Sequence, residues 1–211
     1  TLPDAVRELH CPEDRNSWLR ARNRLAFDEL FLLQAGLMLR RRSYADSRQA
    51  CPVRPGERFG ALMGAELLFP PTAAQRQAIA EILKDMSAST PMNRLLQGDV
   101  GSGKTFVASA AVLAAVDSQL QSAFMAPTEI LAQQHYLRLR ALFEPWGVET
   151  VLLTGSLRSA ERRRVQDALR EGRAQVVVGT HAVLGDAVSF ANLGLVIVDE
   201  QHRFGVLQKN S

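Results

Sequence analysis

The pattern of apolar and polar positions divides the chain into a helical first part and a remainder in which strands and helices alternate. Residues 1–69 contain no strand-like run. Leucines at roughly helical spacing predict one long helix over residues 16–42, with shorter helices predicted over residues 4–10 and 58–69. The pattern therefore predicts a helical segment that precedes a domain of different character.

From residue 70 onward the pattern predicts a parallel α/β domain. Helices are expected over residues 73–86, with Thr72 as N-cap, and over residues 104–116, 129–143 and 159–171. Short apolar runs predict strands over residues 94–97, 122–126, 150–153, 175–178 and 193–198. This alternation is typical of an α/β fold with helices on both faces of a parallel sheet.

The composition is that of a globular protein. Apolar residues make up 46% of the 211 residues and charged residues 22%, which excludes disorder along the whole chain. With 14 Gly, 9 Pro and 2 Cys, collagen-like and disulfide-rich classes are excluded too. The longest apolar stretch, residues 30–39, is too short to span a membrane, and no signal peptide opens the chain. Cys11 and Cys51 lack metal-type spacing and are interpreted as reduced thiols of a cytosolic protein.

Charge alone does not identify a partner. The net charge of +3 permits nucleic-acid binding without arguing for it. The arginines at 40–42 suit the C-terminus of the long helix, where cations are stabilised, and they suit DNA equally well. The arginine-rich segment 158–173 also carries acidic residues, so a solvated, partly paired face is favoured there over a DNA groove.

The strongest chemical signal is a phosphate-binding loop. Residues 98–105, Gly-Asp-Val-Gly-Ser-Gly-Lys-Thr, match G-x-x-x-x-G-K-[ST] between a predicted strand and a predicted helix. The glycines let backbone N–H groups approach phosphate oxygens, and the start of the helix adds positive potential. We expect Lys104 to reach the β- and γ-phosphates and Thr105 to bind Mg²⁺. The predicted nucleotide-binding residues of the loop are Gly98, Asp99, Gly101, Ser102, Gly103, Lys104 and Thr105.

An acidic pair at the end of the last predicted strand forms the second signal. Residues 195–198 are apolar and lead into Asp199 and Glu200. Asp199 is expected to hold Mg²⁺, usually through water, and Glu200 to orient and polarise the attacking water. Together with Lys104, these residues are the predicted catalytic set, and they indicate hydrolysis of a nucleoside triphosphate rather than binding alone.

The residues around these motifs resemble those of superfamily 2 helicases and translocases. Residues 199–202, Asp-Glu-Gln-His, resemble a DExH box. Four further blocks agree with this. Two of them resemble the Q-type motif (residues 69–75) and motif Ia (residues 126–129 with 131–135), and the other two, residues 154–156 and 179–182, resemble DNA-contacting motifs. The resemblance implies a RecA-like motor lobe that uses ATP and Mg²⁺.

Within that superfamily the chain is most similar to the RecG family of bacterial branched-DNA helicases. The similarity rests on residues 98–105, 179–182 and 199–206, and residues 24–30 resemble the segment between that family's wedge domain and its motor. Transcription-repair coupling translocases share much of this pattern, but they typically carry Phe at the place of Ser102. Ser102 therefore favours the RecG family.

The resemblance implies roles for individual residues. Gln75 would contact adenine, and Gln201 and His202 would couple the nucleotide state to DNA through a second motor lobe. The implied contacts to the DNA sugar-phosphate backbone are Thr128, Glu129, Thr154, Gly155, Thr180 and His181. Thr128 is also expected to be an N-cap, which is compatible with a phosphate contact.

The resemblance also implies that the chain is part of a longer protein. Residues 1–69 would link a wedge domain to the motor, and residues 70–211 would be the first RecA-like lobe, cut after the DExH box. The parent would be a monomeric, cytoplasmic bacterial helicase without a membrane partner, remodelling stalled forks and Holliday junctions in recombination and repair. Its second lobe would supply arginine fingers, so the isolated piece would hydrolyse ATP poorly.

Three alternatives stay open at this point. The chain could be the motor lobe of a transcription-repair coupling translocase. It could be a P-loop ATPase with no DNA role. It could also be a non-catalytic nucleotide- and DNA-binding module, or an interaction scaffold that uses residues 16–42.

Overall fold

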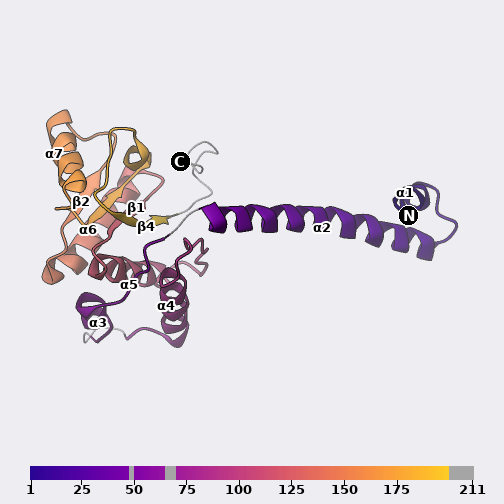
Figure 1. The fold of residues 1–211 in the computed structure, drawn as a ribbon, viewed down its shortest axis with the longest axis horizontal. Helices are drawn as coiled ribbons and strands as arrows, with labels where there is room; N and C mark the ends of the chain where they lie inside the picture. Colours follow the sequence, from indigo (N-terminus) through magenta and orange to yellow (C-terminus); the bar gives the residue numbers. More distant parts are fainter. Residues whose placement is uncertain (48–49, 65–69, 200–211) are drawn as a thin grey trace. The chain divides into compact units, whose positions relative to one another are not determined.

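The structure, a computed structural model, describes residues 1–47, 50–64 and 70–199 (Figure 1). The chain forms two compact units, Thr1–Gln49 and Ala50–Ser211. The division lies at residue 50, not at the predicted residue 70. The reason is packing, because Val53 and Leu62 are 3% and 1% exposed and belong to the core of the second unit.

The first unit contains two helices, α1 (Leu2–His10) and α2 (Arg15–Ser47). Thr1 and Asp4 form a capping box at the start of α1, and Ala5 and Ala21 are buried within the unit. Helix α2 continues to Ser47, beyond the predicted end at residue 42. The arginines at 40–42 therefore do not occupy its last turn, and the explanation from the helix dipole does not apply to them.

The second unit confirms the predicted α/β fold. Within the described residues its sheet has the order β2-β3-β1-β4, and every pairing is parallel. The strands are β1 (Gln121–Met125), β2 (Thr150–Leu153), β3 (Val176–Gly179) and β4 (Leu193–Val198). Each lies within a residue of its predicted bounds.

The strand predicted over residues 94–97 does not form. Arg94 instead makes ion pairs of 2.8 Å with both Glu81 and Asp85 of helix α4 (Ala73–Met86). These pairs hold the start of the segment along α4, and Leu95 remains 73% exposed.

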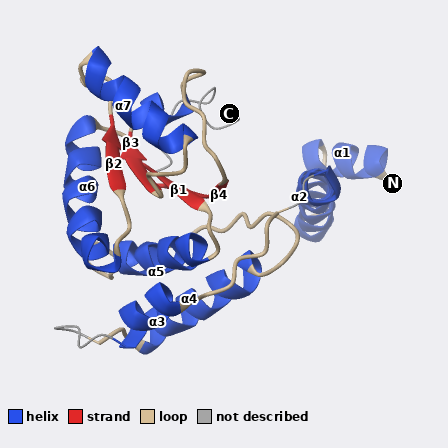
Figure 2. Cartoon of the chain, turned by 60° about the vertical axis from the view of Figure 1, so that its left-hand side comes forward, coloured by secondary structure: helices blue, strands red, loops and turns tan. Residues whose placement is uncertain are grey.

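Helices cover both faces of the sheet, as predicted (Figure 2). Helices α5 (Lys104–Asp117) and α6 (Glu129–Phe143) pack on one face, and α7 (Ser159–Arg170) packs on the other. Short 3-10 helices η1 (Glu144–Trp146) and η2 (His181–Leu184) complete the lobe. The alternate residues of β1 and β3 divide between two cores, since successive side chains of a strand point to opposite faces.

Helix α5 lies inside the second unit rather than on its surface. Its inner side meets the sheet, and its outer side is covered by α4 and by α3 (Glu57–Gly64) (Figure 2). All residues from 109 to 116 are buried, and most are Ala or Val. A helix that is apolar all round is expected in such a position, because neither side faces water.

A carboxylate at the end of α5 holds α3 in place. The Oδ2 atom of Asp117 accepts hydrogen bonds from the N–H groups of Gly56 at 2.9 Å and Phe59 at 3.0 Å. Its Oδ1 atom lies 3.5 Å from Nη1 of Arg58, and the Asp117 side chain is only 4% exposed. Asp117 thus acts as an N-cap for α3 from a distant part of the sequence. Ser118 adds a bond, since its hydroxyl accepts from the N–H of Arg54 at 2.8 Å.

Cys11 and Cys51 are both exposed and free, as the sequence predicts. In the part of the chain that the structure describes, no helix is long and apolar enough to cross a membrane.

Candidate nucleotide and nucleic-acid site

The carboxyl ends of all the described strands carry residues that the sequence analysis selects. Thr128 follows β1, Thr154 follows β2, Thr180 follows β3 and Asp199 follows β4. Since the strands are parallel, these ends meet at one edge of the sheet. This edge is where parallel α/β sheets bind their ligands. The predicted residues are therefore gathered by topology rather than scattered over the fold.

The phosphate-binding loop has the backbone that its glycines predict. Gly101 and Gly103 adopt φ angles of 81° and 82°, in the left-handed region that glycine tolerates. A Cβ on Gly103 would also lie 2.3 Å from Nε2 of Gln75, so the Gln75 side chain would have to move. No side chain caps the first turn of α5, so its N–H groups remain suited to an anion.

Lys104 lies at the start of α5, folded back over the loop. Its Nζ atom donates to the carbonyl oxygens of Gly98 at 2.7 Å and Asp99 at 2.8 Å. The ammonium group is therefore held within the loop that the motif assigns to phosphate. A compact cation in this place suits the β- and γ-phosphates of a nucleotide.

Gln75 contacts the phosphate-binding loop from α4. Its Nε2 donates to the carbonyl of Ser102 at 2.8 Å, and its Oε1 accepts from the N–H of Thr72 at 2.9 Å. The second contact completes a capping box with Thr72, which confirms the predicted N-cap of α4. Gln75 thus joins the start of α4 to the loop, and its contact with adenine stays a prediction.

The donors predicted for Mg²⁺ have the right chemistry. A threonine hydroxyl and an aspartate carboxylate are hard oxygen ligands, which Mg²⁺ prefers alongside water and phosphate oxygens. The Asp199 side chain is 34% exposed at the carboxyl edge, so it is open to a solvated ion. Thr105 lies on the first turn of α5 and is half-buried. Glu200, Gln201 and His202, like Phe69, lie outside the described residues.

The contacts of Glu129 differ from the predicted DNA contact. Thr128 caps α6 by accepting from the N–H of Leu131 at 3.3 Å, as predicted. The Glu129 carboxylate accepts from the N–H of Ser156 at 3.0 Å. Hydrogen bonds from the Ser156 side chain and backbone and from the N–H of Gly155, together with the nearby His181, hold the pKa of the Glu129 carboxyl below its usual value. Glu129 therefore shapes the loop after β2, and as an anion it is poorly suited to meet a phosphate itself.

Replacing Ser156 with alanine is expected to raise the pKa of Glu129 toward its ordinary value, because the largest cause of the lowering is removed. Since the folded-state pKa is depressed, the Glu129–loop interaction is present above the unfolded-state value and is lost as the pH falls through the folded-state value. A carboxyl-carbon NMR titration from neutral to acidic pH measures this. An identical Glu129 titration in the variant and the unaltered chain would contradict the assignment.

The other predicted DNA contacts divide by exposure. Thr154 and Thr180 are only 4% and 3% exposed, so their side chains frame the loops from inside. Gly155 and His181 are exposed at the same edge. Arg162 of α7 stabilises the loop after β2 by donating to the carbonyl of Gly155 at 2.6 Å. In this conformation the exposed loop positions, rather than the buried threonines, are available to a partner.

The arginine-rich segment forms the partly paired face that the sequence favours. Arginines at 158, 170 and 173 each pair with a neighbouring acidic side chain at 2.7 Å. All three pairs lie on the exposed surface, where such pairs contribute little to stability. Neighbouring carboxylates therefore compensate part of the positive charge of the segment.

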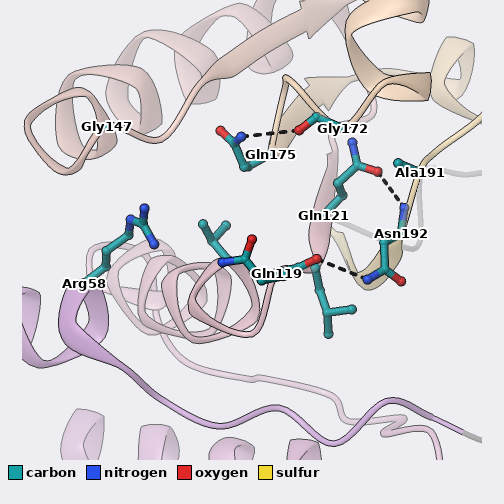
Figure 3. A pocket seen from close by; sticks show the side chains of 10 residues that line it. Arg58, Gln119, Gln121, Gly147, Gly172, Gln175, Ala191 and Asn192 are labelled. Carbon is teal, nitrogen blue, oxygen red and sulfur yellow. Dashed lines mark hydrogen bonds between the residues drawn. The ribbon is translucent and has the colours of Figure 1, made fainter.

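A small polar pocket of about 130 Å³ lies at the opposite, amino edge of the sheet (Figure 3). Gln121 donates from Nε2 to the carbonyls of Leu169 and Ala174 and accepts from the N–H of Asn192. Asn192 in turn donates to the carbonyl of Gln119 at 3.1 Å. These side-chain amides bond to backbone groups near the starts of the strands and so connect them. The pocket carries no reactive group.

Three residues at the carboxyl edge make contacts that the sequence does not predict, although Ser156 and His135 lie in motif blocks named above. Ser156 and Arg162 bind the loop after β2, and His135 binds Asp199 from α6. For His135 a signal was present, since a histidine in the buried row of an otherwise apolar helix face needs a polar partner.

A family model described as DEAD/DEAH box helicase matches residues 72–211. The chain is 44% identical over 208 residues to the ATP-dependent DNA helicase RecG of Synechocystis sp. and 47% identical over 210 residues to the protein of the same name from Aquifex aeolicus. These alignments cover 99% and 97% of this chain but 25% and 26% of the two relatives. The chain thus spans about a quarter of the length of the curated relatives it matches.

A solved structure described as RecG bound to a three-way DNA junction matches the fold with a TM-score of 0.88 at 42% identity. The match covers 96% of this chain and 28% of that one.

Proposed function

The chain belongs to the DEAD/DEAH box helicase family, and we propose that it is the first motor lobe of an ATP-dependent DNA helicase that remodels branched DNA. One observation carries the proposal. The phosphate-binding loop opens α5, and parallel strands that end at one edge of the sheet lead into Thr128, Thr154, Thr180 and Asp199. The similarity to RecG proteins, one of them solved on a three-way DNA junction, supports branched DNA as the substrate.

On the nucleotide side, each residue has a separate task. Lys104 would exchange its bonds to the loop carbonyls for phosphate oxygens, and the first-turn N–H groups of α5 would add further donors. Thr105 and Asp199 would hold Mg²⁺, which neutralises charge on the phosphates when bound. Gln75 would read adenine while it supports the loop through Ser102. Glu200 is proposed to orient the attacking water.

On the DNA side, the loops at the carboxyl edge would follow one strand of the backbone. We propose direct contacts at Thr128, Gly155 and His181, which are exposed. Backbone N–H groups and the start of α6 suit phosphate oxygens without reading the base sequence. Glu129, with Thr154 and Thr180, would shape these loops from behind.

The proposal extends to a longer protein. We propose that a second RecA-like lobe and a wedge domain complete the motor, that Gln201 and His202 couple the lobes, and that the whole acts as a monomer in the bacterial cytoplasm. The lengths of the relatives support a longer protein, and the free cysteines fit a reducing compartment.

The test compares ATP hydrolysis by the full-length protein with and without DNA. Forked DNA is expected to stimulate hydrolysis and to be converted to separated or re-annealed strands. The chain of residues 1–211 alone should hydrolyse ATP at least about 10³-fold more slowly than the full-length protein, because an arginine finger raises the rate about 10³–10⁵-fold. Linear duplex DNA is the control. An ATPase rate indifferent to every DNA would favour a P-loop ATPase without a DNA role.

A further inference from the structure

His135 is a buried polar side chain that the proposed nucleotide and DNA contacts do not use. It lies on the inner side of α6 in a row with Ala132, Leu139 and Phe143 and is 8% exposed. Its ring packs against Phe124 of β1, with ring centroids 4.7 Å apart. A leucine would fill this row without any polar atom, so the imidazole is costly here unless it makes a hydrogen bond.

The partner of His135 is the carboxylate of Asp199. The Nε2 atom of His135 lies 2.9 Å from Oδ2 of Asp199. An ionised carboxylate only accepts, so Nε2 carries the proton and donates. The backbone N–H of Asp199 donates to the carbonyl of Met125 at 2.8 Å. Strand β1 therefore holds the main chain of Asp199, while α6 holds its side chain.

Only one oxygen of the carboxylate is used in this way. Among the described residues, Oδ1 of Asp199 accepts no hydrogen bond, and about a third of the side chain is open to solvent. A carboxylate held at one oxygen cannot rotate freely about its last torsion. The other oxygen is thereby kept in a defined direction at the carboxyl edge.

We propose that His135 is a positioning residue for Asp199, holding Oδ2 so that Oδ1 is presented to the magnesium–nucleotide complex. The inference rests on the proposed function, because the metal role of Asp199 belongs to it. Hydrogen-bond partners of metal ligands orient those ligands, and their loss typically costs about 10–100-fold in metal affinity or activity. His135 acts through Asp199 and does not touch the nucleotide itself.

The same bond connects the two halves of the proposed site. Helix α6 begins at Thr128 and Glu129, on the proposed DNA side, and His135 lies two turns further along it. A shift of α6 on DNA binding would carry Nε2 with it and move the carboxylate of Asp199. His135 thus supplies a direct physical connection through which DNA could change nucleotide hydrolysis.

The test uses the full-length protein with His135→Leu, which keeps the packing volume, and His135→Gln, which keeps an N–H donor. Binding of a fluorescent ADP is measured in Mg²⁺ and in EDTA. For His135→Leu we expect the gain in affinity due to Mg²⁺ to fall about 10-fold or more, while the affinity in EDTA stays unchanged. His135→Gln should recover part of the gain, and DNA-stimulated hydrolysis should follow the same order.

Gln134→Ala is the matched control, because Gln134 is the exposed neighbour of His135 on α6. Its Mg²⁺-dependent gain should equal that of the unaltered protein. If the unaltered protein shows no such gain, the metal role within the proposed function is wrong. If it shows the gain and His135→Leu keeps it in full, the positioning role is wrong. If His135→Leu and His135→Gln lower the affinity for ADP by the same factor in Mg²⁺ and in EDTA, His135 is only structural and the inference is overturned.

Discussion

Replacing Lys104 with alanine is expected to lower kcat for ATP hydrolysis by the full-length protein about 10²–10³-fold, the usual effect of removing one donor from a developing oxyanion. The structure holds the ammonium group between the carbonyls of Gly98 and Asp99, inside the phosphate-binding loop. Alanine leaves that position without a cation, and no other Lys lies in the loop motif. Steady-state hydrolysis with saturating forked DNA measures the effect.

Two controls define what the Lys104→Ala result means. Lys84→Ala removes an exposed lysine at the last turn of α4, outside the proposed site, and should leave hydrolysis unchanged. Binding of forked DNA by Lys104→Ala should also be unchanged, since the proposed DNA contacts lie on other loops. A Lys104→Ala protein that hydrolyses ATP and remodels forks at the normal rate would remove the central support for the proposed nucleotide site.

The largest effect on stability is expected at Asp117. Its carboxylate accepts from the N–H of Gly56, just before α3, and from the N–H of Phe59 in the first turn, and it pairs with Arg58. Asp117→Ala removes these acceptors from the start of α3. We expect the free energy of unfolding to fall by about 2–4 kcal/mol, from the lost cap and the charged hydrogen bonds. Urea denaturation of the 211-residue chain measures this.

Asp85→Ala provides the comparison for Asp117. Asp85 makes an exposed ion pair with Arg94, and its loss should cost less than about 1 kcal/mol. Asp117→Asn keeps one oxygen as an acceptor and should recover part of the stability. If Asp117→Ala and Asp85→Ala destabilise the chain equally, the distant cap contributes nothing beyond an ordinary surface pair.

The sequence predicted best those elements whose burial leaves a simple pattern. Strand β2 and helices α4 and α6 have the predicted bounds, because their caps or apolar runs are local signals. The strand expected at 94–97 does not form, and Arg94 pairs with α4 instead, a contact that the local apolar pattern does not show. Residues 50–64 join the second unit through the burial of Val53 and Leu62 and through Asp117, and these contacts are too distant in sequence for any local pattern to show.

The candidate site divides in the same way. The phosphate-binding loop and the strand ends could be predicted because phosphate chemistry demands particular residues at fixed spacing. The contacts of Glu129 with Ser156 and of His135 with Asp199 could not, since each joins loops or helices from different crossovers. Sequence spacing identifies residues that share one helix, strand or loop. These partners are far apart in the sequence and come together only when the parallel sheet forms.

The burial of α5 on both sides makes it the fixed reference of the lobe. Its residues from 109 to 116 are all buried, so they can be exposed to solvent only if the core opens. Local opening of this helix would therefore require nearly the full free energy of unfolding. The phosphate-binding loop is mounted on this immobile helix. During the proposed cycle of ATP hydrolysis we therefore expect α6 and the loops at the carboxyl edge to move, while the nucleotide phosphates stay fixed on α5.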